Sequence, residues 1–185
     1  MNDKIILDLC GGTGSWSKPY SDAGYDVRLV TLPKNDVRLY IPPENVHGIL
    51  AAPPCTMFSL ARTTAKTPRD FIGALSVVDA CLRIVWKTKP KWWALENPTG
   101  LLRRFLGKPT TTFNPCDYGD AYTKRTDLWG SFTEPKKNPV AITEEMKKKL
   151  AINSRPLPKI AGLTQADKRA ITPPAFAKAF FEANQ

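Results

Sequence analysis

The chain carries three short motifs, each directly after a run of apolar residues, and their order constrains the fold more than any other feature. The motifs are Gly11-Gly12-Thr13-Gly14 after residues 4–9, Pro53-Pro54-Cys55 after 48–52, and Glu96-Asn97-Pro98 after 92–95. Short apolar runs that stop at glycine or proline are typical of buried strands. The sequence therefore predicts three strands that each end at a polar or reactive motif.

Helical patterns lie between the predicted strands. Apolar residues recur at steps of three and four over residues 69–86, which predicts an amphipathic helix. Further elements are predicted as a strand at 27–32 and helices at 15–23, 101–106, 143–152, 164–170 and 175–183. Alternating strands and helices indicate an α/β fold with a mostly parallel sheet flanked by helices. Ligands bind at the carboxyl ends of such strands, so we expect the three motifs to converge on one edge.

Length and composition indicate one compact domain spanning residues 1–185. The 185 residues are 42% hydrophobic, but no apolar run reaches the ~20 residues that a bilayer span needs. The first residues do not resemble a secretory signal. We therefore expect a cytoplasmic protein with no membrane contact.

Cysteine and histidine content argues against a metal site. The four cysteines form no Cys-x-x-Cys pair, and His47 is the single histidine. Each cysteine is thus read as a free thiol. Cys55 follows a strand on a proline-stiffened loop, which suits a nucleophile. A small buried core residue is the alternative, and it is the one we favour for Cys10, Cys81 and Cys116.

The charge balance favours a polyanionic partner. The formal net charge is +10, and the excess of Lys and Arg is concentrated beyond residue 85. Such a surface suits nucleic acid, although a basic solvated surface explains charge alone equally well. The glycine-rich turn allows close approach of a ligand to the backbone, but it lacks the Lys-Ser/Thr of a phosphate-binding loop.

Taken together and in order, the three motifs resemble those of the cytosine-C5 DNA methyltransferases. Tyr122–Thr126 resembles the family's arginine-bearing strand motif, and Thr172–Ala177 resembles its closing segment beside the cofactor. The resemblance covers nearly the whole chain. It implies a Rossmann-like fold dependent on S-adenosyl-L-methionine (AdoMet) and the activity of a DNA (cytosine-5-)-methyltransferase.

The resemblance also implies residue roles. The Cys55 thiolate would add to C6 of cytosine, Glu96 would hydrogen-bond or protonate N3, and Arg125 would contact O2 and favour the thiolate. The substrate pocket would be formed by Pro54, Asn97, Pro98 and Lys124. The cofactor would be held by Asp8, Leu9, Cys10, Gly11, Gly12, Thr13, Gly14, Trp16, Asp36, Val37, Pro53 and Thr172. Asp36 could instead be an ordinary turn aspartate, and Trp16 a core residue.

Three departures from the family limit what the resemblance implies. An acidic residue usually ends the second strand, where this chain has Thr31-Leu32, and the helix expected before Asp36 is absent. The third departure is the missing target-recognition domain, in whose place the chain has a short basic insert at 133–172. We therefore expect short or relaxed sequence specificity, or a protein partner that selects the target. The insert's phosphate contacts would come from Lys136, Lys137, Lys147, Lys148, Lys149, Lys159, Lys168 and Arg169.

Other functions stay open at this level. The missing domain also allows methylation of single-stranded DNA, RNA or a free cytosine nucleotide. A catalytically silent module that binds AdoMet or DNA is a further alternative, against which the joint presence of Cys55, Glu96 and Arg125 argues. So small an enzyme would suit a bacteriophage, acting in the host cytoplasm.

Overall fold

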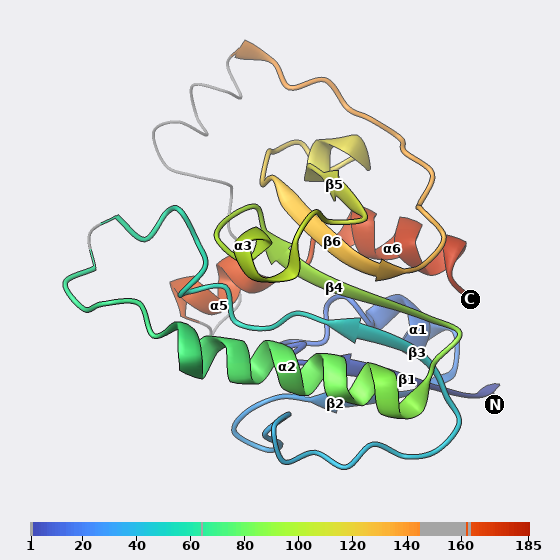
Figure 1. Cartoon of the computed structure of the whole chain (residues 1–185). Coiled ribbons are helices and arrows are strands. Elements are labelled where there is room, and N and C mark those ends of the chain that lie inside the picture. The colour runs from blue at the N-terminus through green and yellow to red at the C-terminus, as the bar shows by residue number, and fades with distance from the viewer. Residues whose placement is uncertain (1, 64, 145–161, 163) are drawn as a thin grey trace.

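A six-stranded sheet forms the centre of the protein, in the order β2-β1-β3-β4-β6-β5 (Figure 1). The computed structural model describes residues 2–63, 65–144, 162 and 164–185. Its strands are β1 (Asn2–Leu9), β2 (Tyr25–Val30), β3 (Val46–Ala51), β4 (Trp92–Pro98), β5 (Thr111–Phe113) and β6 (Thr126–Ser131). The first four are parallel, and β6 and β5 extend the sheet in antiparallel fashion. The predicted α/β fold with a mostly parallel sheet is confirmed.

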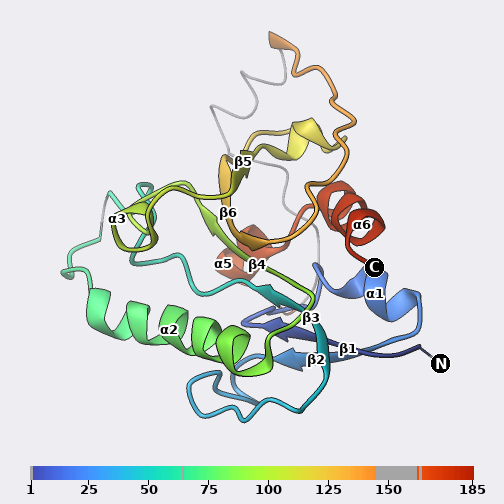
Figure 2. The same cartoon turned by 45° about the vertical axis from the view of Figure 1, so that its right-hand side comes forward.

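Helices cover both faces of the sheet (Figures 1 and 2). The longest, α2 (Phe71–Thr88), lies across one face, and α1 (Lys18–Asp22) and α6 (Pro174–Ala183) cover the other. The remaining helices are α3 (Arg103–Leu106), the 3-10 turn η1 (Pro115–Asp117) and α5 (Gln165–Ala170). In the part of the chain that the structure describes, no helix has the length and apolarity to span a membrane.

Strand alternation divides the core into two layers of different composition. Leu7, Ile49 and Leu95 point to the α2 face, where aliphatic side chains predominate. Ile6 and Leu50 point to the opposite face, which is rich in aromatic rings from α1 and α6. Because successive strand residues face opposite sides, this division also tells which sheet face each residue of the candidate site occupies.

Several element boundaries differ from the sequence predictions. The second strand begins at Tyr25 and ends at Val30, because the Asn35 amide hydrogen-bonds to the Thr31 carbonyl in a turn. The first helix begins at Lys18, with a proline in its first turn. The long helix is shifted to Phe71–Thr88, since the Asp70 side chain caps it by accepting from Gly73 N. The helix predicted at 143–152 lies almost wholly outside the described residues.

The fourth strand continues past its predicted end. Glu96-Asn97-Pro98 was expected to follow a strand at 92–95, but all three residues belong to β4. The reason is β6, whose residues pair with Glu96, Asn97 and Pro98 in antiparallel register. The motif is therefore held by a neighbouring strand and does not lie on a loop.

Candidate active site

The three motifs lie side by side at one edge of the sheet, as predicted. β1, β3 and β4 are adjacent and parallel, and their register aligns Leu9 with Ala51 and Ala51 with Leu95. The glycine-rich turn and the Pro53-Pro54-Cys55 loop therefore begin at the level of Glu96, where β4 continues beside β6. Residues separated by more than 80 positions in the sequence come together in one place.

The turn after β1 is defined by backbone conformation. Cys10, Gly12 and Gly14 all have positive φ, and Gly14 N donates to Gly11 O at 2.9 Å. A Cβ at Gly12 would meet no atom within 4 Å, so the backbone there is open to a ligand. At Gly11, in contrast, a Cβ would collide with the carboxylate of Asp8.

Asp8 supports this turn from below. Its side chain is fully buried and accepts a hydrogen bond from the Ser17 hydroxyl at 2.5 Å, while its other oxygen, Oδ1, has no partner among the described residues. Burial raises the pKa of Asp8 to about 6, against the lowering effect of Ser17. Thr172, distant in sequence, reaches the same turn, since its amide donates to Ser15 Oγ at 3.0 Å.

The Cys55 loop is held by contacts from other segments. Asn97 of β4 donates from its buried Nδ2 to Pro53 O at 2.9 Å. The amides of Phe58 and Ser59 donate to Cys55 O, and the Phe58 ring is fully buried. These contacts fix the backbone on both sides of the thiol.

Arg69 closes the loop from its far end. Its guanidinium donates to Met57 O at 2.5 Å and to Ser59 O at 3.0 Å, although ten or more residues separate it from both. The sequence did not single out Arg69. Its position just before the Asp70 cap of α2 is the only local signal, and that signal indicates a helix start and not a loop contact.

Two charged groups act on the Cys55 thiol. Burial and the Glu96 carboxylate raise the pKa of Cys55, and the Lys124 ammonium opposes that rise. Lys124 Nζ lies 3.6 Å from Glu96 Oε1, and both side chains are mostly shielded from solvent. Cys55, Glu96 and Lys124 thus form one electrostatic group at the sheet edge.

Arg125, the predicted catalytic arginine, takes a different place. It is exposed, and within the described residues its side chain makes no ion pair or hydrogen bond; only its carbonyl is engaged, by Thr99 N. Next to it, Asp127 is fully buried and binds Arg103, Thr99 and Thr112. This network, which the sequence did not reveal, holds the start of β6 against β4 and α3.

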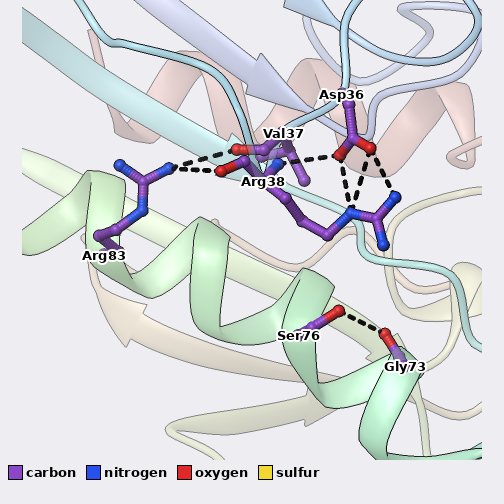
Figure 3. Close-up of polar contacts among 6 residues, drawn as sticks. All are labelled: Asp36, Val37, Arg38, Gly73, Ser76 and Arg83. Carbon is purple, nitrogen blue, oxygen red and sulfur yellow. Dashed lines mark hydrogen bonds and ion pairs between the residues drawn. The ribbon is translucent and has the colours of Figure 1, made fainter.

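The segment that contains Asp36 is bound locally (Figure 3). The Arg38 side chain and amide occupy both carboxylate oxygens of Asp36, and the Arg38 side chain lowers the pKa of Asp36 to about 2. Arg83 of α2 donates to the carbonyls of Val37 and Arg38 at 3.4 Å. The ion pair favours the turn role for Asp36, and its contact with the cofactor stays a prediction.

The other predicted site residues differ in how accessible they are. Trp16 is buried against Phe176 and Phe180, which favours the core role left open for it. Leu9 and Val37 are also buried, Pro53 is buried and Pro54 is exposed. Thr13 is exposed and Pro98 is half-buried. Roles of these residues toward ligands stay predictions.

The cysteine expectations are partly corrected. Cys81 is buried, as predicted, but Cys10 and Cys116 are only half-buried. Cys10 lies in the exposed turn after β1 and shares a thiol hydrogen bond with Cys81, whereas Cys116 lies in the short η1 turn near the surface. No cluster of potential metal ligands occurs among the residues that the structure describes.

Comparison with known proteins identifies the family. The family of C-5 cytosine-specific DNA methylases matches residues 20–118, more than half of the chain. No curated protein matches the sequence. Among solved structures, a prophage-encoded E. coli protein described as a DNA modification methyltransferase is 19% identical with a TM-score of 0.49; the match covers 70% of this chain and 47% of that one. The Entamoeba histolytica methyltransferase EhMeth is 10% identical with a TM-score of 0.41, and the match covers 78% and 57%.

The chain therefore belongs to the C-5 cytosine-specific DNA methylase family, as its motifs indicated. It spans about half the length of the solved methyltransferases that it resembles. The matched region includes the Cys55 loop and the Glu96 motif, which are two of the three motifs at the sheet edge.

Proposed function

We propose that this protein methylates C5 of cytosine in DNA, with AdoMet as the methyl donor and Cys55 as the covalent nucleophile. The observation that carries the proposal is the grouping of Cys55, Glu96 and Lys124 at the sheet edge beside an open glycine turn. A thiol, a carboxyl group and a cation in one place are the groups that this chemistry needs.

Cys55 and Glu96 each have a task in the reaction. The Cys55 sulfur forms a bond to C6, and the electrons of the C5–C6 double bond move toward N3, which takes a proton or hydrogen bond from Glu96. C5 becomes nucleophilic and would take the methyl group, whose bond to the donor's sulfur would break with the electron pair left on that sulfur. A base then removes the C5 proton, the C5–C6 double bond re-forms, the Cys55 sulfur leaves C6 with its electron pair, and N3 returns its proton to Glu96. The thiol must start as the thiolate, although burial raises its pKa.

The turn after β1 fits AdoMet. The open space at Gly12 allows close backbone contact, and the unpartnered, buried Oδ1 of Asp8 offers an acceptor beneath the turn. When bound, AdoMet supplies a methyl group that is activated by a positively charged sulfur. The residues that would hold it are Asp8, Gly11, Gly12 and Gly14, with Thr172 on the far side of the turn.

Target selection is assigned to the segment between β6 and α6. Among its described lysines, Lys136 and Lys137 are exposed and Lys168 is half-buried, and Lys137 lies 3.9 Å from Asp117. Phosphate contacts by this basic insert would give affinity without base-specific readout. We therefore propose short or relaxed specificity, or a protein partner that chooses the site. In duplex DNA the target base must leave the stack to reach Cys55.

The test is transfer of a labelled methyl group to duplex DNA, single-stranded DNA, RNA and dCMP, followed by nucleoside analysis. We expect 5-methylcytosine in DNA. A label that enters only RNA or dCMP would keep the chemistry and change the substrate. Absence of transfer to all four, together with AdoMet binding, would favour a silent binding module.

A second measurement tests the nucleophile. DNA that carries 5-fluorocytosine has no C5 proton to lose, so the adduct with Cys55 should persist and survive SDS. Cys55→Ala should form none, whereas Cys116→Ala, a half-buried cysteine in η1, serves as the matched control and should react like wild type. An adduct that persists in Cys55→Ala would assign the nucleophile elsewhere.

A further inference from the structure

The register of β4 and β6 decides which of two adjacent cations serves the site. In this antiparallel pair Glu96 lies opposite Leu128 and Pro98 lies opposite Thr126. Residues directly opposite share a sheet face. Leu128 belongs to the aromatic core layer, so Glu96 and Thr126 lie on that face, and Asn97 and Asp127 lie on the other.

The hydrogen-bond pattern between β4 and β6 continues one step beyond the paired residues of the two strands. Thr99 N donates to Arg125 O at 2.9 Å, which keeps the same register as the pair of Asn97 and Asp127. The Arg125 side chain therefore leaves the backbone on the same sheet face as Asp127. On that face the Thr99 hydroxyl also binds Asp127 at 2.8 Å. Lys124, one residue earlier, is directed to the face of Glu96.

Further contacts hold Lys124 in this place. The Thr126 hydroxyl donates to Lys124 O at 2.7 Å, and the Thr126 side chain is itself buried. The Lys124 ammonium lies 3.6 Å from Glu96 Oε1, with 22% of its side chain exposed. A cation that is mostly shielded from water acts on its neighbours more strongly than an exposed one.

We propose that Lys124, and not the adjacent Arg125, is the cation that positions Glu96 and stabilises the negatively charged sulfur of Cys55. The inference rests on the proposed function for the role of Cys55 as nucleophile. It departs from the arginine that the family resemblance implied, and it makes Lys124 a positioning residue. Arg125, exposed on the other face, remains available to contact the nucleic acid.

The groups that face Cys55 make the proposal measurable. Glu96 comes from β4 and Lys124 from the segment before β6, and they shift the pKa of the thiol in opposite directions. Iodoacetamide alkylates the thiolate, and mass spectrometry can follow the alkylation rate of the Cys55 peptide over a pH series. The pH at which this rate is half-maximal is the titration midpoint of the Cys55 thiol. This readout needs neither methyl transfer nor DNA.

We expect Lys124→Met to raise the midpoint by about one pH unit and to slow adduct formation with 5-fluorocytosine DNA about tenfold at neutral pH. Lys124→Arg should restore both values. Glu96→Gln should move the midpoint in the opposite direction, downward, and so tests the same electrostatics with a second variant. Arg125→Met should leave the midpoint unchanged, as should Lys87→Met on the exposed side of α2.

The outcomes separate this inference from the proposed function. A midpoint that moves with Arg125→Met and not with Lys124→Met would overturn the assignment. If wild type forms no adduct but Lys124→Met still raises the midpoint, the pairing stands and the proposed function fails. If wild type forms the adduct and Lys124→Met changes neither readout, the assignment alone fails.

Discussion

The turn after β1 and the loop after β3 leave the sheet side by side, yet they are built in opposite ways. The turn takes its shape from its own backbone, with positive φ at Cys10, Gly12 and Gly14. The loop takes its shape from elsewhere, since Asn97 and Arg69 hold its carbonyls. A site that receives a cofactor needs exposed backbone, whereas a nucleophile needs a fixed side chain.

This contrast predicts how the two regions respond to substitution. Changes in the turn should act through backbone conformation and through Asp8, which lies beneath it. Changes around the loop should act indirectly, through the side chains of Asn97 and Arg69 that hold its backbone carbonyls. AdoMet affinity reports on the first region, and the rate of covalent adduct formation reports on the second.

The largest effect is expected for Gly11→Ala. The added Cβ would collide with the fully buried Asp8 carboxylate, which should cost about 3 kcal/mol of stability and abolish measurable AdoMet binding. Gly12→Ala is the matched control, because its Cβ meets open space and only its positive φ is strained, at about 1 kcal/mol. Urea denaturation measures the stability of both variants, and AdoMet titration measures their affinity for AdoMet. Equal losses in the two variants would contradict the steric explanation.

Asp8→Asn should change how stability depends on pH. Burial raises the pKa of Asp8 from its ordinary value of 3.8 to about 6 in the folded protein, so folding favours the protonated carboxyl. The contribution of this proton to the free energy of unfolding is complete below about pH 4. It is lost as pH rises through 6, which lowers the free energy of unfolding by about 3 kcal/mol. Asparagine mimics the protonated carboxyl. The stability of Asp8→Asn relative to wild type should therefore increase as pH rises from about 4 through 6 and then stay constant.

Urea denaturation at a series of pH values checks this prediction. Ser17→Ala, which removes the hydroxyl that lowers the pKa of Asp8, should enlarge the loss of stability with rising pH. A gap between wild type and Asp8→Asn that does not vary with pH would show that Asp8 is ionised at no cost in the folded state.

Asn97→Ala should loosen the Cys55 loop. It removes the buried hydrogen bond to Pro53 O and leaves that carbonyl unpaired, at a cost of about 2 kcal/mol. The rate of adduct formation should fall more than AdoMet affinity, because the turn after β1 does not depend on Asn97. A selective loss of AdoMet binding would contradict the separation between the two regions.

The smallest effect is expected for Arg69→Met, at about 1 kcal/mol of stability. Its loss frees Met57 O and Ser59 O, so adduct formation should slow severalfold with little change in the affinity for AdoMet. Arg62→Met is the matched control, since the Arg62 side chain donates to Thr67 and Pro68 within the same exposed segment. Equal slowing in both variants would remove the special role of Arg69.

Local sequence was sufficient for the parallel strands, for the long helix and for the edge where the site lies. The apolar runs before Gly11, Pro53 and Glu96 predicted three strands, and parallel strands bring their carboxyl ends together whatever the details of packing. The spacing of Phe71, Leu75 and Val78 predicted α2 because the helical period is a local property. These predictions need no knowledge of which strands are neighbours.

The sequence could not show how far β4 extends or which cation faces Glu96. Both depend on the pairing of β4 with β6, which joins residues about 30 positions apart and was not visible in either segment. The roles of Arg69 and of the Asp127 network were hidden for the same reason. Hydrogen bonds across the fold, and not residue type, place Lys124 on one sheet face and Arg125 on the other, because a shift of one residue in a strand reverses the face that a side chain occupies.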